Sequence, residues 1–170
     1  MFAKRIWRYK WPVLAPFDQA LGKLVFADAT GRHEKTYFYE PSAQSGYPPF
    51  CVSVGYAALD WHRTVVPAPK AKATLLIVRP HLFRSWPLPL SSAADTEQLT
   101  FRRLVDRMPD PARSFVEMRE DAGHLTVSVG LEFALSADDI ERDPDGPCRA
   151  WIDCLNVMAF PPHNAAARFG

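Results

Sequence analysis

The most regular pattern of apolar and polar positions in the chain lies between residues 115 and 135. Over residues 125–135 every second residue is large and apolar, and the residues between them are small or polar. Side chains of a strand point alternately to its two faces, so this run predicts an antiparallel strand with one buried and one wet face. Residues 115–120 also alternate, and residues 121–123 (Asp-Ala-Gly) have the composition of a tight turn. The segment therefore predicts a long β-hairpin.

Two short helices are predicted to follow this hairpin. Ser136 and Asp139 have the spacing of a capping box, in which two residues cap free N–H groups at a helix start. This helix is expected to end early, because residues 143–147 contain two prolines and a glycine. A second helix is expected to restart at Pro147 and to end before Pro161. Its aligned apolar positions are Cys148, Ile152, Leu155 and Ala159, with Trp151 beside them.

The first half of the chain predicts strands joined by proline-rich loops. Apolar and aromatic residues occur there in short runs bounded by prolines and glycines, which is typical of strands in a sheet. The predicted strands are residues 24–26, 36–40, 50–61 and 73–78, with a turn around Gly31. The predicted loops are residues 41–49 and 80–89.

Three further segments lie outside this pattern. Residues 1–22 are predicted to be irregular, because Pro12 and Pro16 exclude a long helix and leave room for a single turn. Residues 101–108 carry apolar side chains at helical spacing and predict a helix, with Ser92 or Asp95 as its cap and Pro109 at its end. Residues 163–170 are expected to be frayed.

Together these elements predict one domain, residues 1–170, of the α+β class. We expect a mainly antiparallel, twisted sheet of five or six strands with two or three helices packed on one face. The chain has 170 residues, of which 48% are hydrophobic and 23% charged, which is the composition of a globular domain with a proper core.

Charge is unevenly distributed along the chain. The first 90 residues contain 12 Lys and Arg against 5 Asp and Glu, whereas the last 80 contain 8 against 14. The two halves can attract each other within the fold, or they can present faces of opposite sign to a charged partner. No apolar stretch reaches the about 18 residues that a membrane helix needs, and the N-terminus lacks the apolar core of a signal peptide. We therefore expect a cytoplasmic protein without a membrane partner.

Residues with catalytic or metal-binding chemistry form no known motif. Cys51, Cys148 and Cys154 lack metal-site spacing and are expected to be free, buried thiols. The five histidines never occur at the i, i+2 or i, i+4 spacing that builds metal sites. No phosphate loop, dinucleotide fingerprint or nucleophile elbow occurs. The sequence thus predicts no catalytic residue, no cofactor and no metal, and it favours a non-enzymatic function.

An acidic run near the C-terminus is the first candidate for a partner-binding site. It includes a fragment of a calcium loop, but the downstream glutamate and the other ligands of such a loop are missing. Helix capping and solvation explain most of these carboxylates, and a protein-binding face is the functional alternative. The carboxylates are those of Asp138, Asp139, Glu141, Asp143 and Asp145.

Two other segments carry alternative functions. Asp60, Trp61 and His62 lie at the end of a predicted strand, where they can line a pocket for a small ligand or substrate. Residues 4–11 combine cations with aromatic rings and can bind nucleic acid by phosphate contacts and stacking. In the opposing interpretation Trp7 and Trp11 pack on the sheet with the cations outside, and a pI of 7.8 makes a nucleic-acid partner the less favoured one.

The order helix, hairpin, helix over residues 104–160 resembles the second half of the fold shared by YbjN-like bacterial regulators and type III secretion chaperones. In that group a strand pair with an acidic or glycine-containing turn leads into a capped C-terminal helix. The resemblance implies a non-enzymatic domain that binds proteins or forms a homodimer through its sheet or helices, and it assigns no functional residue. The residues that carry it are 104–108, 115–120, 124–135, 136–139 and 151–158.

The sequence thus favours a bacterial protein-binding module, such as an effector chaperone, an adaptor or a toxin-neutralising immunity protein. The 12% aromatic content supports this expectation, because aromatic side chains anchor interfaces. A small enzyme or ligand-binding domain comes second, and nucleic-acid binding third.

Overall fold

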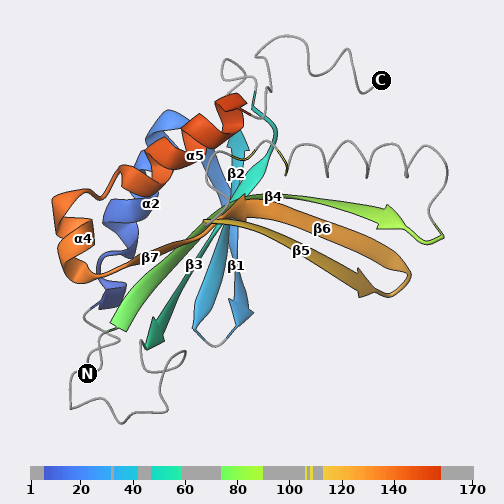
Figure 1. Cartoon of the computed structure of the whole chain (residues 1–170), viewed down its shortest axis with the longest axis horizontal. Helices are drawn as coiled ribbons and strands as arrows, with labels where there is room; N and C mark the ends of the chain where they lie inside the picture. The colour runs from blue at the N-terminus through green and yellow to red at the C-terminus, as the bar shows by residue number, and fades with distance from the viewer. Residues whose placement is uncertain are drawn as a thin grey trace.

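A single antiparallel sheet organises the chain (Figure 1). The computed structural model describes residues 6–31, 33–41, 47–58, 74–89, 106, 108 and 113–157. The sheet has seven strands in the order β1-β2-β3-β4-β6-β5, and β7 pairs with the first half of β4. The strands are β1 (Gly22–Gly31), β2 (Glu34–Pro41), β3 (Phe50–Ala58), β4 (Thr74–Pro87), β5 (Ser114–Asp121), β6 (His124–Leu131) and β7 (Phe133–Leu135).

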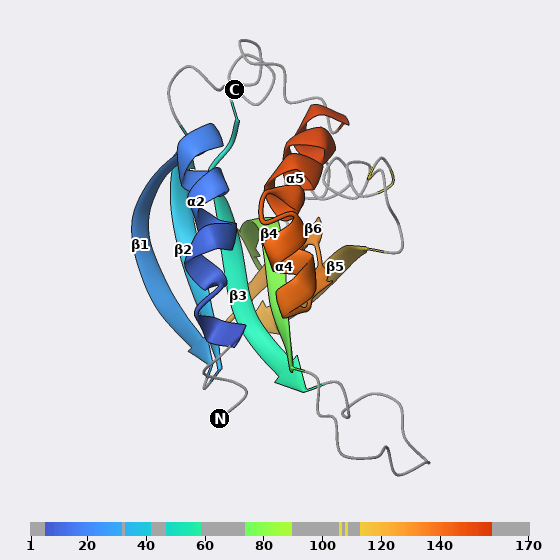
Figure 2. The ribbon, with the colours of Figure 1, turned by 90° about the vertical axis from the view of Figure 1, so that its left-hand side faces the viewer.

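Three described helices cover one face of this sheet (Figure 2). They are α2 (Lys10–Ala20), α4 (Ala137–Arg142) and α5 (Gly146–Val157). The predicted α+β class and antiparallel sheet are confirmed, and the sheet has seven strands where five or six were expected. Strands β5 and β6 and the far half of β4 extend away from the helices (Figure 1).

Pro80 explains why the strand predicted over residues 125–135 is divided into β6 and β7. Residues 80–89 were predicted as a loop, and this prediction was wrong up to Pro87, because β4 continues through Pro80. The pairs Val78–Phe133 and His81–Gly130 belong to one register, with Glu132 between β6 and β7. Proline has no N–H to donate, so the ladder is interrupted beside Pro80 and the long predicted strand appears as two.

The N-terminal segment is the second correction. Residues 10–20 form helix α2, although Pro12 and Pro16 led to the prediction of irregular structure. Pro12 lies in the first turn, where no intrahelical bond is lost, and Pro16 lies inside the helix at a cost of about 3 kcal/mol. Val13, Leu14 and Phe17 are at most 1% exposed, and each such burial contributes about 1.5–3 kcal/mol. Packing therefore outweighs the proline.

The other predicted strands and helices are present where the structure describes them, but β1 extends to Gly31 through residues that were predicted to form the turn. The hairpin of β5 and β6 turns at Ala122 and Gly123, both with positive φ, which matches the twist of the flanking strands. Ser136 and Asp139 form the predicted capping box of α4, and the chain breaks before α5 as expected. The predicted helix 101–108 lies outside the described residues except for two of its positions, and residues 163–170 lie wholly outside them.

The core lies between the sheet and the helices. Strand residues Val52, Val54 and Leu76 are completely buried there, and so are Trp151 and Leu155 of α5. We call this side of the sheet the helix face and the opposite side the open face. The three cysteines are free and buried, as the sequence predicted.

Candidate functional site

The open face carries a row of aromatic side chains that crosses the sheet. Cross-strand partners of an antiparallel sheet share a face, and the register aligns one residue from each of six strands. These residues are Phe26, Phe38, Cys51, His81, Gly130 and Phe115, in spatial order from β1 to β5. Phe83, two residues beyond His81 on β4, points to the same face.

The rings of this row contact one another. Phe26 stacks on Phe38 with centroids 4.2 Å apart, and Phe38 meets the edge of Phe83 at 6.3 Å. His81 lies 6.5 Å from Phe83 and 6.2 Å from Phe115. We call Phe26, Phe38, His81, Phe83 and Phe115 the aromatic row. Phe26 is 55% exposed and Phe83 50% exposed, so the row offers apolar surface to solvent.

Small residues between the rings keep the row close to the sheet. A Cβ at Gly130 would clash most closely with the carbonyl oxygen of Pro80, and it would lie 2.6 Å from Cβ of His81 and 2.8 Å from Cζ of Phe115, so only glycine fits there. Cys51 is 1% exposed, and burial raises the pKa of its thiol to about 12. A thiol with that pKa stays protonated at neutral pH and is not a nucleophile. Cys51 therefore fills space.

Charged groups surround the row, with carboxylates in excess. Arg79 donates to Glu132 at 2.6 Å and lies 3.7 Å from Glu34, so two glutamates enclose one guanidinium. On the open face of strands β2 to β6, the register places four carboxylates against two guanidinium groups among the described residues, and Glu132 follows β6 and accepts from Arg79. The strand residues are Glu34, Glu40, Glu117 and Asp121, against Arg79 and Arg119. This face is therefore acidic around an apolar centre.

His81 is the titratable member of the row. Its Nδ1 lies 2.9 Å from the carbonyl oxygen of Arg79. Burial lowers the pKa of His81 below its usual 6.5, and this outweighs the opposing effects of the Arg79 carbonyl and of Glu117 and Glu34. The ring is thus uncharged at neutral pH and lies as a flat aromatic ring between Phe83 and Phe115.

The acidic run predicted as a partner site is largely engaged within the protein. Asp139 caps α4 through Ser136, and this hydrogen bonding lowers the pKa of its carboxyl. Glu141 accepts a hydrogen bond from the hydroxyl of Tyr9, and Asp143 pairs with Arg149. The other two members, Asp138 and Asp145, are exposed. The run thus stabilises the corner between α4, α5 and the N-terminal segment.

The aromatic residues of the N-terminal segment pack against the protein. Trp7 meets the edge of Tyr56 at 5.8 Å, and Trp11 meets the edge of Tyr37 at 5.9 Å. Lys10 lies over both tryptophan rings, at 5.3 Å from Trp7 and 4.7 Å from Trp11. These contacts match the interpretation in which Trp7 and Trp11 pack on the sheet.

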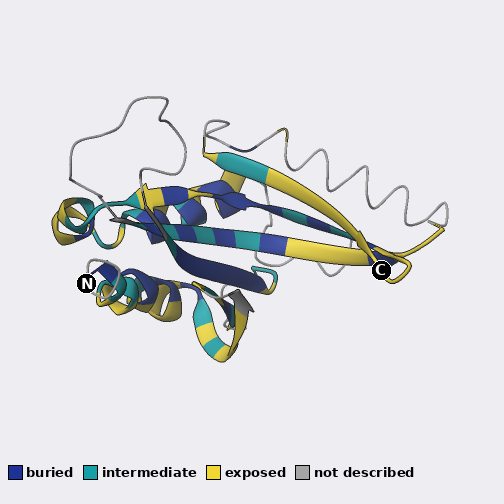
Figure 3. Ribbon diagram, turned by 90° about the horizontal axis from the view of Figure 1, so that it is seen from below, coloured by how far each residue is buried: buried dark blue, intermediate teal, exposed yellow. Residues whose placement is uncertain are grey.

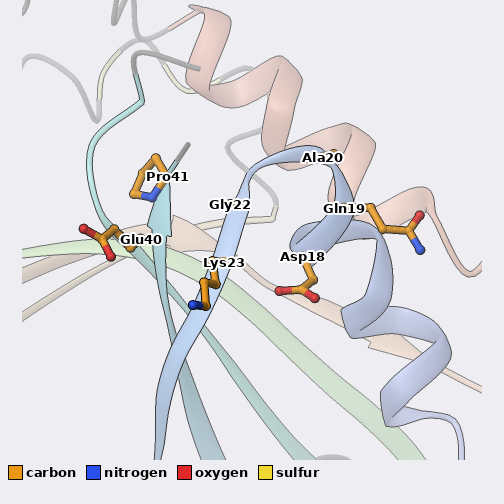
Figure 4. Close-up of a pocket in the computed structure, with 7 residues that line it drawn as sticks. All are labelled: Asp18, Gln19, Ala20, Gly22, Lys23, Glu40 and Pro41. Carbon is orange, nitrogen blue, oxygen red and sulfur yellow. The ribbon is translucent and has the colours of Figure 1, made fainter. Parts of the chain in front are cut away.

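The predicted ligand site at Asp60, Trp61 and His62 lies outside the described residues. A shallow pocket of about 410 Å³ lies elsewhere, at the junction of α2 with β1 and the end of β2 (Figure 4). Asp18 in its wall accepts a hydrogen bond from the backbone of Leu24, and Lys23 and Glu40 stand at its rim. Within the described ranges, no three His, Cys, Asp or Glu side chains gather as a metal site would require.

Comparison of the chain with protein-family models, with curated proteins and with solved structures found no match. Among the described helices, none is long and apolar enough to cross a membrane.

The aromatic row was missed by sequence reasoning. Its members come from four strands, and at most two of them lie close together in the sequence. Phe83 was assigned to a loop, which hid its alternation with Leu82 and with the rest of β4. The available signal was the alternation itself, since residues 79, 81, 83 and 85 share one face once β4 is extended through Pro80.

Proposed function

We propose that this protein is a non-catalytic protein-binding module, such as an effector chaperone, an adaptor or a toxin-neutralising immunity protein. The observation that carries the proposal is the aromatic row, an apolar stripe on the sheet face opposite the described helices. Soluble proteins seldom leave grouped large apolar side chains exposed without a use, and such patches mark interaction sites. Aromatic side chains in particular anchor interfaces.

The chemistry of the open face selects the type of partner. Phe26 and Phe83 can insert between apolar side chains, and the surrounding carboxylates favour a segment that also carries Lys or Arg. A partner segment with an apolar stripe flanked by basic residues fits both features. This proposal moves the binding surface from the acidic run at 138–145 to the open face, because three of the five carboxylates in that run already have partners in the protein.

The hairpin and the capped helix after it are consistent with a protein-binding role of the kind that the resemblance to YbjN-like regulators and type III secretion chaperones implies. The β5–β6 hairpin leads into the capped helix α4, and the helix at residues 104–108 that also carries the resemblance lies outside the described residues except for residues 106 and 108. The proposal does not depend on that resemblance, since the exposed aromatic row argues for binding by itself.

Selection of peptides from a displayed random library tests the proposal. Peptides enriched on the wild-type protein are expected to combine apolar residues with Lys or Arg. In calorimetry the Phe83→Ser variant should bind them at least about tenfold more weakly, which is about 1.4 kcal/mol. The Val157→Ser variant is the matched control, because Val157 is 48% exposed and lies at the end of α5.

Two results would count against the proposal. One is the absence of any enriched peptide, also when purified products of neighbouring genes are tested by calorimetry. The other is enrichment of peptides that bind the Phe83→Ser variant as tightly as the wild type. In both cases the open face is not the binding surface.

A further inference from the structure

Among the residues that the structure describes, none covers the β5 edge of the sheet with a further strand. Among the described strands, β5 pairs only with β6, and the side chains from Val116 to Asp121 are all exposed (Figure 3). Its eight residues contain no proline and no bulge, since every position pairs in one unbroken register. An edge of this kind presents a row of backbone donors and acceptors that can pair with another strand.

Hydrogen bonding shows which backbone groups point outward. The carbonyl of Arg113 accepts a bond from N–H of Glu132, which fixes the odd-numbered residues of β5 as those bonded to β6. The hairpin turn agrees, because Asp121 pairs with His124 across two turn residues. Val116, Met118 and Glu120 therefore direct their N–H and C=O groups away from the sheet.

The side chains of β5 complement a second copy of the same strand. Glu117 and Arg119 lie on the open face with opposite charges, and neither forms an ion pair with a described residue. Met118, which is 53% exposed, lies between them on the other face. In an antiparallel pair centred on Met118, Glu117 of each copy stands opposite Arg119 of the other. These pairs are of the non-hydrogen-bonded type, whose side chains approach most closely.

We infer that β5 pairs antiparallel with β5 of a second copy of this chain, around a two-fold axis at Met118. The backbone N–H and C=O of Met118 then hydrogen-bond to those of Met118 in the other copy, and the backbone groups of Val116 hydrogen-bond to those of Glu120 in the other copy. Moving the axis to Glu117 or to Arg119 keeps the backbone bonds but places like charges opposite each other. Charge thus selects the register centred on Met118.

This pairing joins two sheets into one continuous sheet. The axis stands perpendicular to the sheet, so the open faces of both copies lie on the same side, with Phe115 of each copy close to the seam. The inference does not rest on the proposed peptide-binding function, because the edge and the open face are different surfaces. A protein with both properties would present two aromatic rows to one partner.

Charge reversal at the seam tests the inference. We expect sedimentation velocity of the wild type to show a reversible dimer of the 19.2 kDa chain over about 1–500 µM. The Glu117→Arg and Arg119→Glu variants each place like charges opposite each other and should raise the dimer Kd at least about tenfold. The double variant Glu117→Arg/Arg119→Glu restores opposite charges and should return the Kd to within about threefold of wild type.

Controls and a second readout keep the test decisive. The Asp138→Arg variant reverses an exposed charge on α4 and should leave the Kd unchanged. In hydrogen exchange, the amides of Val116, Met118 and Glu120 should gain protection as wild-type concentration rises, and should not gain it in Glu117→Arg. The inference is overturned if the wild type stays monomeric at the highest concentration, or if it dimerises equally with either single reversal. A double variant as weak as the singles would also overturn it.

Discussion

The two faces of the sheet differ in how their apolar side chains are used. On the helix face, Val52, Val54 and Leu76 are completely buried under helices, and Trp151 and Leu155 complete that core. On the open face the aromatic side chains form a single row, and two of its phenylalanines are half exposed. Both faces follow from the same alternation along the same strands.

The difference separates stability from recognition. A side chain that is fully buried contributes its whole transfer free energy to folding, whereas one that is half exposed contributes only part of it. The helix face therefore stabilises the fold, and apolar area on the open face stays accessible for contact with a partner. Substitutions on the two faces are expected to separate these roles.

The largest difference between the faces is expected from aromatic truncation. Trp151 is 0% exposed, and its Nε1 has no hydrogen-bond acceptor among the described residues, so packing alone accounts for its contribution. Trp151→Ala should lower the free energy of unfolding by about 3–5 kcal/mol. Phe83→Ala on the open face should lower it by about 1 kcal/mol or less. Urea denaturation followed by circular dichroism measures both, and equal losses would mean that the two faces do not differ in this way.

A smaller effect is expected where the open face is tightly packed. Gly130→Ala brings a Cβ against the Pro80 carbonyl oxygen, His81 and Phe115, and this overpacking should lower the free energy of unfolding by about 1–3 kcal/mol. Ser128→Ala is the matched control, because Ser128 lies two residues away on the same strand and face, and its change should be within about 0.5 kcal/mol. Chemical denaturation of both variants measures the effect. If Gly130→Ala is as stable as the wild type, the row does not pack closely on the sheet.

The smallest effect concerns protonation of the open face. Because the folded state holds the pKa of His81 below 6.5, the unfolded state binds a proton more readily as pH falls. The contribution of His81 to stability is therefore present above about pH 6.5 and is lost as pH falls from there toward the folded pKa. Thermal unfolding from pH 7.5 to 5 should show a shallower acid loss for His81→Gln than for the wild type. A loss of stability in His81→Gln that is as steep as that of the wild type would contradict the assignment.

Local patterns were sufficient for the C-terminal half of the fold. The β5–β6 hairpin, the capping box of α4 and the break before α5 all depend on residues within a few positions of each other. Alternation, turn composition and capping are local properties, so the sequence displays them directly. The candidate site at the acidic run was visible for the same reason, and the structure shows that capping and ion pairs occupy three of its carboxylates.

Prolines misled sequence reasoning in two places, and in both the tertiary structure decided the outcome. Helix α2 forms despite Pro16 because Val13, Leu14 and Phe17 are buried against the sheet. Strand β4 continues past Pro80 because its neighbours on both sides supply the rest of the ladder. A local rule gives the cost of a proline, but the gain from packing depends on partners far away in the sequence.

The sequence by itself determined the α+β class, the presence of the β5–β6 hairpin and the starts of the two helices after residue 135, because alternation, turn composition and capping involve residues close together in the chain. Only the tertiary structure placed Phe26, Phe38, His81, Phe83 and Phe115 in one row and left β5 as the last of the described strands. Strand order decides which side chains meet and which strand lies last, and that order is fixed by long-range pairing rather than by any local pattern.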